Sequence, residues 1–133
     1  TNMSKIEQGL KYTPEHEWIK VEADQKAIVG ITDFAQGELG ELVYVEVTTV
    51  GKTLNKGQVF GTVEAVKTTS DLFMPVSGKI LEFNEAISDK GGDNPGLINE
   101  DPYGAGWIIK IELTDSSELE SLLEGSAYQE LIQ

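Results

Sequence analysis

The residues that could do chemistry gather in one stretch, residues 57–80, with Lys67 at its centre. Two runs typical of strands flank this lysine, and a two-residue turn at Lys67-Thr68 predicts a hairpin with the amine at its tip. An exposed lysine is usually a solubilising residue, as we expect of the other nine. A lysine at a rigid tip among small side chains is open to a modifying enzyme, and once acylated it becomes the swinging arm of a group carrier.

Two carboxylates lie on the arms of this predicted hairpin. Counting outward from the turn places Glu64 directly opposite Asp71, an arrangement that normally destabilises a sheet by up to about 1 kcal/mol. The pair therefore indicates a function, either beside a carrier lysine or as the acid and base of a hydrolase such as a glycosidase. A hairpin tip offers no deep cleft for a sugar ring, which disfavours the hydrolase.

Composition excludes several other kinds of chemistry. The 133 residues include no cysteine and one histidine, His16, which excludes disulfides, thiol nucleophiles and His-rich metal sites. Ten lysines, no arginine and 23 acids give a formal net charge of −13, which disfavours nucleic acids and membranes as partners. The phosphate-binding patterns GxxxxGK[ST] and GxGxxG are absent from the sequence.

The elements that must position these residues are short strands joined by glycine-rich turns. The patterns predict a hairpin over 16–31, a helical turn over 32–40 and strands over 42–47, 58–66 and 107–113. An extended run is predicted over 72–83, broken at Pro75 and at Ser77-Gly78. They also predict a C-terminal helical segment over 116–132, in which Gly125 ends a first helix. We expect a mainly β sandwich or barrel that forms a single domain over residues 1–133.

The two ends of the chain lead to further expectations. Thr1 and Asn2 have the character of a cloning remnant ahead of a natural start at Met3, and the start of the chain lacks a signal or transit pattern. We expect a monomer in the cytoplasm of a bacterium, or in the mitochondrial matrix of a eukaryote. The acidic residues of 111–133 leave two interpretations open, a solvated helix face or a surface for a basic partner.

Five motifs, in order, resemble one known family, the glycine cleavage system H proteins, which are lipoyl carriers. The motifs are LKYTPEHEWIKVE (10–22), VGITDFAQGELGELVYVEV (29–47), VGKTLNKGQVFGTVEAVKTTSDLFMPVSGKILEFNEAI (50–87), NPGLINEDPYGAGWIIKIEL (94–113) and ELESLLEGSAYQELI (118–132). The resemblance implies lipoate on Lys67. It assigns the other sites as follows: lipoylation recognition by Glu64 and Gly51, hairpin geometry at Gly78, and a cleft for the loaded arm at Glu17 and Asp71.

The same resemblance implies the architecture and the partners. The fold would be a flattened barrel-sandwich hybrid of the lipoyl- and biotinyl-carrier type, with a few short peripheral helices, one of them C-terminal. The chain alone would not catalyse a reaction. Its arm would carry an aminomethyl group from a pyridoxal-phosphate-dependent glycine decarboxylase to a tetrahydrofolate-dependent aminomethyltransferase. A dihydrolipoyl dehydrogenase would reoxidise the arm, and lipoylating enzymes would attach it.

Related carriers differ from this sequence around the lysine. Biotin carriers place methionine on both sides, and the lipoyl domains of 2-oxoacid dehydrogenases place aspartate before and alanine after, whereas Val66 and Thr68 stand here. Two positions depart from the H-protein pattern: residues 88–94 form a longer loop, and Glu15 replaces a small hydroxyl residue near the cleft. An H-like protein that donates lipoyl groups to other enzymes, or serves redox signalling, stays open as an alternative because the arm chemistry is the same.

Overall fold

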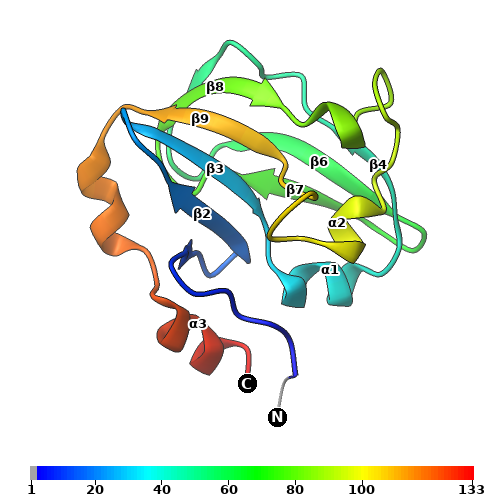
Figure 1. The fold of residues 1–133 in the computed structure, drawn as a ribbon, viewed down its shortest axis with the longest axis horizontal. Helices are drawn as coiled ribbons and strands as arrows, with labels where there is room; N and C mark the ends of the chain where they lie inside the picture. Colours follow the sequence, from blue (N-terminus) through cyan, green and yellow to red (C-terminus); the bar gives the residue numbers. More distant parts are fainter. Residues whose placement is uncertain (1–2) are drawn as a thin grey trace.

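The strands form two antiparallel sheets (Figure 1). The structure, a computed structural model, describes residues 3–133, so the two expected cloning-remnant residues lie outside it. One sheet has the strand order β1-β2-β3-β9-β8-β5 and the other the order β4-β6-β7. The bounds are β1 (Lys11–Tyr12), β2 (Glu17–Val21), β3 (Lys26–Ile31), β4 (Leu42–Glu46), β5 (Thr53–Leu54), β6 (Val59–Ala65), β7 (Thr69–Phe73), β8 (Gly78–Phe83) and β9 (Ile109–Leu113).

The main apolar core takes side chains from both sheets. In β9 the fully buried isoleucine and leucine side chains alternate with Lys110 and Glu112, as expected of a strand with one face on a core. The smaller sheet adds Leu42, Val63 and Leu72 to the same cluster. The predicted mainly β architecture is confirmed. The smaller sheet packs one face on the core, and this packing holds its hairpin.

Short helices lie outside the sheets. α1 (Asp33–Leu39) begins after Thr32, whose hydroxyl accepts a hydrogen bond of 3.2 Å from the Ala35 N–H, so the helical turn predicted here is confirmed. The others are η1 (Glu85–Ile87), α2 (Leu97–Glu100), η2 (Ser116–Ser121) and α3 (Gly125–Leu131). Within residues 3–133, none of the helices has the length and apolar character needed to cross a membrane.

The C-terminal segment differs from the predicted succession of helices. Gly125 begins α3 instead of ending the preceding helix, and η2 stops at Ser121. Between them, Leu123 and Tyr12 exchange two backbone hydrogen bonds of 2.9 and 2.8 Å. A residue paired in this way is extended, because its N–H and C=O must both face a neighbouring strand. The helix therefore ends where the chain pairs with the edge of the larger sheet.

Gly78 brings β8 and β9 into close contact. A Cβ atom at this position would lie 2.7 Å from the Glu112 carbonyl oxygen, which belongs to the backbone of β9. Gly37, on the exposed side of α1, provides a matched contrast because a Cβ there would have no neighbour within 4 Å.

We expect Gly78→Ala to lower the free energy of unfolding by about 1–3 kcal/mol, because the two strands must separate. Gly37→Ala should raise it by about 0.5–1 kcal/mol, since alanine favours helix and restricts the unfolded chain. Urea unfolding of both variants measures the two effects. A Gly78→Ala variant as stable as the parent would show that β9 yields without strain.

Candidate functional site

Lys67 lies at the turn of the β6–β7 hairpin, which projects to the right in Figure 1. Val66 and Lys67 form the turn, closed by a hydrogen bond of 2.7 Å from the Ala65 N–H to the Thr68 carbonyl. Lys67 is exposed, and Val66 is 70% exposed. Among the ion pairs within residues 3–133, Lys67 takes part in none. The predicted location of this lysine at a hairpin tip is confirmed.

The predicted register of the hairpin is wrong. Glu64 pairs with Thr69, and Asp71 pairs with Thr62, so the two carboxylates are not directly opposite each other. The pairing differs by two residues from the expected one, and a difference of two keeps each side chain on its face. Glu64 and Asp71 are therefore diagonal neighbours on one face, and the repulsion expected of an opposed pair does not apply.

The neighbouring strand β4 explains the difference. It pairs Leu42 with Ala65, the last residue of β6, and leaves Val66 outside the ladder. The Val66 N–H instead donates to the Glu41 carbonyl at 3.2 Å. Because a third strand ends its pairing at Ala65, the turn starts one residue earlier than counting along two strands predicts.

Glu17 is a buried acid at the start of β2, with only 2% of its surface exposed. Its Oε1 accepts a hydrogen bond of 2.7 Å from the Thr13 hydroxyl, and its Oε2 accepts a long one of 3.5 Å from the Phe73 N–H. Burial raises the pKa of Glu17 to about 7, against the opposing effect of these two hydrogen bonds. Glu17 thus joins the larger sheet to β7, the strand that carries Asp71.

A tight turn over residues 13–17 directs Glu17 inward. The His16 N–H donates to the Thr13 carbonyl at 3.0 Å, and the Thr13 N–H donates to the Glu17 carbonyl at 3.0 Å. His16 adopts a φ of 72°, which is rare for a residue other than glycine. Thr13 was not predicted as a site residue; a hydroxyl four positions before a buried acid, across a proline-containing turn, is the signal that could have revealed it.

The C-terminal helix supports this turn. His16 Nδ1 lies 2.8 Å from the Tyr128 hydroxyl, which in turn lies 2.7 Å from the Thr32 hydroxyl. The Tyr128 ring stacks on Tyr12 at a centroid distance of 4.8 Å. Burial lowers the pKa of His16, while Glu15 and Glu38 oppose this effect. The polar groups behind the buried acid are therefore held by hydrogen bonds.

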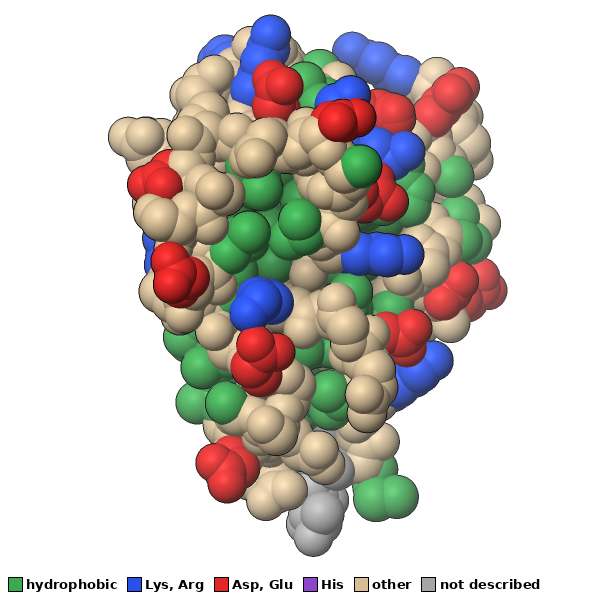
Figure 2. All heavy atoms as spheres, turned by 60° about the vertical axis from the view of Figure 1, so that its left-hand side comes forward, with side chains coloured by type: hydrophobic (Ala, Val, Ile, Leu, Met, Phe, Trp, Pro, Cys, Tyr) green, Lys and Arg blue, Asp and Glu red, His purple; other side chains and the backbone are tan. Residues whose placement is uncertain are grey.

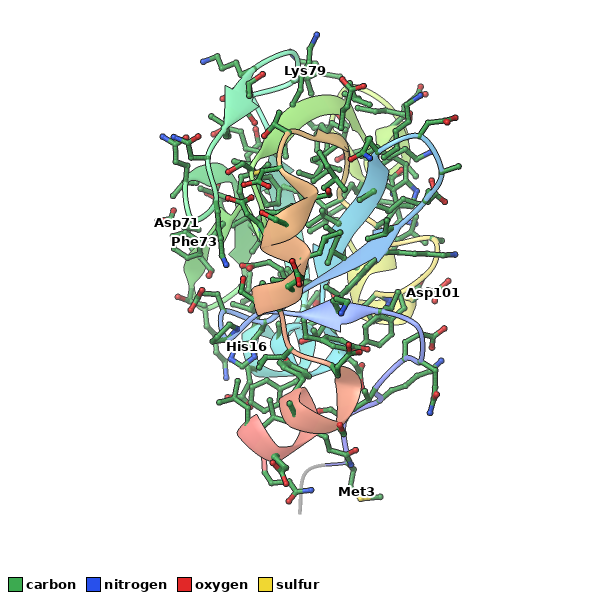
Figure 3. The ribbon with its side chains drawn as sticks, turned by 90° about the vertical axis from the view of Figure 1, so that its left-hand side faces the viewer. Met3, His16, Asp71, Phe73, Lys79 and Asp101 are labelled. Carbon is green, nitrogen blue, oxygen red and sulfur yellow. The ribbon has the colours of Figure 1, made fainter. Side chains whose placement is uncertain are left out.

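Figure 3 relates these residues in space. Asp71 and Phe73 lie on one flank of the molecule, His16 lies lower on the same flank, and Asp101 lies on the opposite flank. The Glu17 carboxylate contacts the Phe73 N–H, so the buried acid reaches β7 two residues from Asp71 on the same strand.

Two predicted residues lie elsewhere. The Gly51 N–H donates to the Ile80 carbonyl at 2.7 Å, and Gly51 has a φ of 90°, which suits glycine. Gly78 pairs with Leu54. Gly51 therefore serves the pairing of β5 with β8, and Gly78, which also pairs with Leu113 of β9, shapes the larger sheet instead of the lysine hairpin.

The arrangement suits attachment of a carboxylic acid group to an amine. Lys67 is exposed and takes part in none of the ion pairs among residues 3–133, so forming an amide at its amine breaks no buried contact, and the tip leaves room for a long arm. Among the described residues, groups of three or more His, Cys, Asp or Glu side chains that could hold a metal ion are absent.

A family model described as "Glycine cleavage H-protein" matches residues 10–133. The chain belongs to this family. It is 55% identical to the glycine cleavage system H protein of Bacteroides thetaiotaomicron, over 94% of this chain and 95% of that protein, and 48% identical to the one of Marinobacter nauticus, over 96% and 95%. A crystal structure of the Mycobacterium marinum H protein superposes with a TM-score of 0.84 at 40% identity, covering 94% of this chain and 97% of that one.

Membership in the glycine cleavage H-protein family confirms the identification made from the five sequence motifs. The likeness to the Mycobacterium marinum H protein also confirms the predicted fold class, because it extends over nearly the whole of both chains. In this member of the family, Glu17 is buried and its pKa is raised. The effect of its titration on stability can therefore be measured.

We expect Glu17 to make the stability of this H-protein family member depend on pH. Its folded pKa of about 7 lies above the ordinary value of 4.5, so between these values the folded state binds more protons than the unfolded state. The free energy of unfolding should fall as pH rises through this window, by at most about 3 kcal/mol. Glu17→Gln should lack this fall.

Urea unfolding of both proteins from about pH 4.5 to about pH 8 measures the difference. His16 acts in the opposite sense, because its lowered pKa removes stability as pH falls, but it is present in both proteins and cancels in the comparison. Parallel pH profiles for the two proteins would contradict a protonated, buried Glu17.

Proposed function

We propose that this chain is the lipoyl carrier of a glycine cleavage system, with lipoate bound through an amide to Lys67. The observation that carries the proposal is the position of this lysine: it is exposed, it is free of ion pairs with the described residues, and it lies at the turn of a hairpin that packs one face on the core. Family membership supports the carrier role. The relatives named above carry the glycine cleavage name, which favours this role over a lipoyl relay.

The protein contributes an attachment point for the arm and a charged surface. When bound, lipoate supplies a dithiol–disulfide pair that accepts the aminomethyl group at the decarboxylase and gives it up at the aminomethyltransferase. Amide formation removes the charge of Lys67. The lysine side chain then links the arm flexibly to a turn whose backbone is held by hydrogen bonds. The dihydrolipoyl dehydrogenase and the lipoylating enzymes would approach the same tip, because it is the end of the hairpin.

We assign Glu17 and Asp71 to a resting place for the loaded arm. Asp71 is exposed on β7, whereas Glu17 is buried and reaches the same strand with an oxygen whose hydrogen bond, at 3.5 Å, is long. That oxygen keeps capacity for a stronger donor. A cationic amine placed there would favour the ionised form of Glu17 and so lower its pKa, and exclusion of water would protect the amine.

The surface charge supports docking on basic partners. The chain has a formal net charge of −13. On the face in Figure 2, acids and lysines are interspersed around a central group of hydrophobic side chains, so the negative charge of this face is not gathered in one patch. Loss of the Lys67 charge on lipoylation makes the carrier more negative. Attraction of this kind speeds encounter with basic active-site mouths and weakens as salt screens it.

Lys67→Arg should abolish lipoylation and glycine decarboxylation while changing the free energy of unfolding by less than about 1 kcal/mol. Arginine keeps the positive charge but cannot form the amide. Intact mass after treatment with a lipoylating enzyme, followed by a coupled assay with the partner enzymes, measures both effects. The matched control is Lys79→Arg, which replaces an exposed lysine in β8. This variant keeps Lys67 and should be lipoylated there as the parent is. Lipoylation of Lys67→Arg would refute the attachment site.

Glu64→Ala should slow lipoylation severalfold with little change in stability. Glu64 is exposed on β6, near the end of the ladder, where a lipoylating enzyme must dock to reach the amine. The control is Glu46→Ala, an exposed acid on the neighbouring strand that pairs with Thr62, farther from the turn. Initial rates of lipoylation for the three proteins decide the matter, and equal slowing in both variants would assign the effect to overall charge instead of to Glu64.

A further inference from the structure

The side chain of Asn99 in α2 holds the start of β4. Its Oδ1 accepts a hydrogen bond of 3.0 Å from the Leu42 N–H, and its Nδ2 donates to the Gly40 carbonyl at 2.9 Å. A third bond, also 2.9 Å, runs from Nδ2 to Gln36 Oε1 in α1. One side chain thus fixes the backbone on both sides of residue 41. Figure 1 shows α2 beside α1, where these bonds form.

The backbone that Asn99 fixes continues into the lysine tip. The carbonyl of Glu41 accepts the hydrogen bond of 3.2 Å from the Val66 N–H, and Leu42 pairs with Ala65. Glu41 lies between the two residues that Asn99 binds, so its carbonyl can move little while those bonds persist. Val66 is the residue before Lys67. Asn99 is therefore linked to the tip through one short piece of backbone.

The turn itself does little to set its own geometry. Two-residue hairpin turns that suit the twist of the strands need a positive φ at one or both turn residues. In the described chain, positive φ outside glycine occurs at His16, Asp24, Gln25 and Asp93, and so not at the two turn residues. The position of the tip therefore depends on its contacts with β4.

We propose that Asn99 is a positioning residue for Lys67, acting through residues 40–42 and Val66 to hold the backbone of the tip in one place for the lipoylating enzyme. The proposal rests on the proposed attachment of lipoate to Lys67. Asn99 does not touch the lysine. Its effect is preorganisation: a tip that is already ordered loses less conformational freedom when it docks, so the enzyme binds it more tightly.

The test compares Asn99→Ala with two control variants of the full chain. Asn84 also makes three side-chain hydrogen bonds, but to Ala86, Ala105 and Trp107, so Asn84→Ala removes as many bonds without touching residues 40–42. Gln36→Ala removes one Asn99 partner and leaves both bonds to Gly40 and Leu42 in place. Thermal unfolding sets a temperature at which all the variants are folded.

Two quantities are then measured at that temperature: the hydrogen-exchange rate of the Val66 amide by NMR, and kcat and KM for lipoylation by a lipoate ligase. Asn99→Ala should speed Val66 exchange about tenfold and raise KM about three- to tenfold, with kcat changed less than about twofold. Asn84→Ala should lower the melting temperature at least as much, yet leave both quantities as in the parent. Gln36→Ala should stay close to the parent.

Unchanged Val66 exchange and unchanged KM in Asn99→Ala would overturn the proposal. Equal changes in Asn84→Ala would also overturn it, because the effect would then follow general destabilisation. Failure of the parent itself to accept lipoate on Lys67 would instead refute the proposed attachment. In that case the Val66 exchange rates would still decide whether Asn99 holds the tip.

Discussion

Backbone pairing between β4 and β6 determines where the lysine hairpin ends, because the turn has no sequence that favours its own geometry. β4 pairs as far as Ala65 and takes the next N–H through the Glu41 carbonyl. The hairpin is thereby the middle and edge of a three-stranded sheet, not a free two-stranded ribbon, which would be marginal in water. The backbone that carries an exposed amine can be held in place in this way while the amine itself is not buried. The carrier role needs both properties, a free amine and a rigid base.

Glu17, the buried acid at the start of β2, is a second feature that constrains the fold. A carboxyl group with 2% exposure is unfavourable as an ion unless it is well hydrogen-bonded, and Glu17 has one short and one long hydrogen bond. The turn that precedes Glu17 is held in place by the contact of His16 with Tyr128, which lies in the C-terminal helix.

Much of the fold could be predicted from residue patterns, and the failures share one cause. The hairpin predicted over 16–31, the strand predicted over 42–47 and the helix after Thr32 follow from alternation and capping, which are local, and the structure has strands or a helix at each place. The hairpin register and the break between η2 and α3 were wrong because a third segment, β4 in one place and Tyr12 in the other, forms backbone hydrogen bonds that override the local pattern. Counting along one or two strands cannot include that partner.

The sequence by itself determined the kind of protein: motif order identifies the family, composition excludes thiol chemistry and disfavours nucleic acids as partners, and small neighbours single out Lys67 among the lysines. The tertiary structure decided how the site is held. Only the folded chain shows that Glu17 is buried against β7, that Gly51 and Gly78 belong to the pairing of β5 with β8, and that Asn99 fixes the backbone beside the tip. These facts depend on contacts between residues far apart in the chain, whose energies come from burial and backbone pairing that no short stretch of sequence contains.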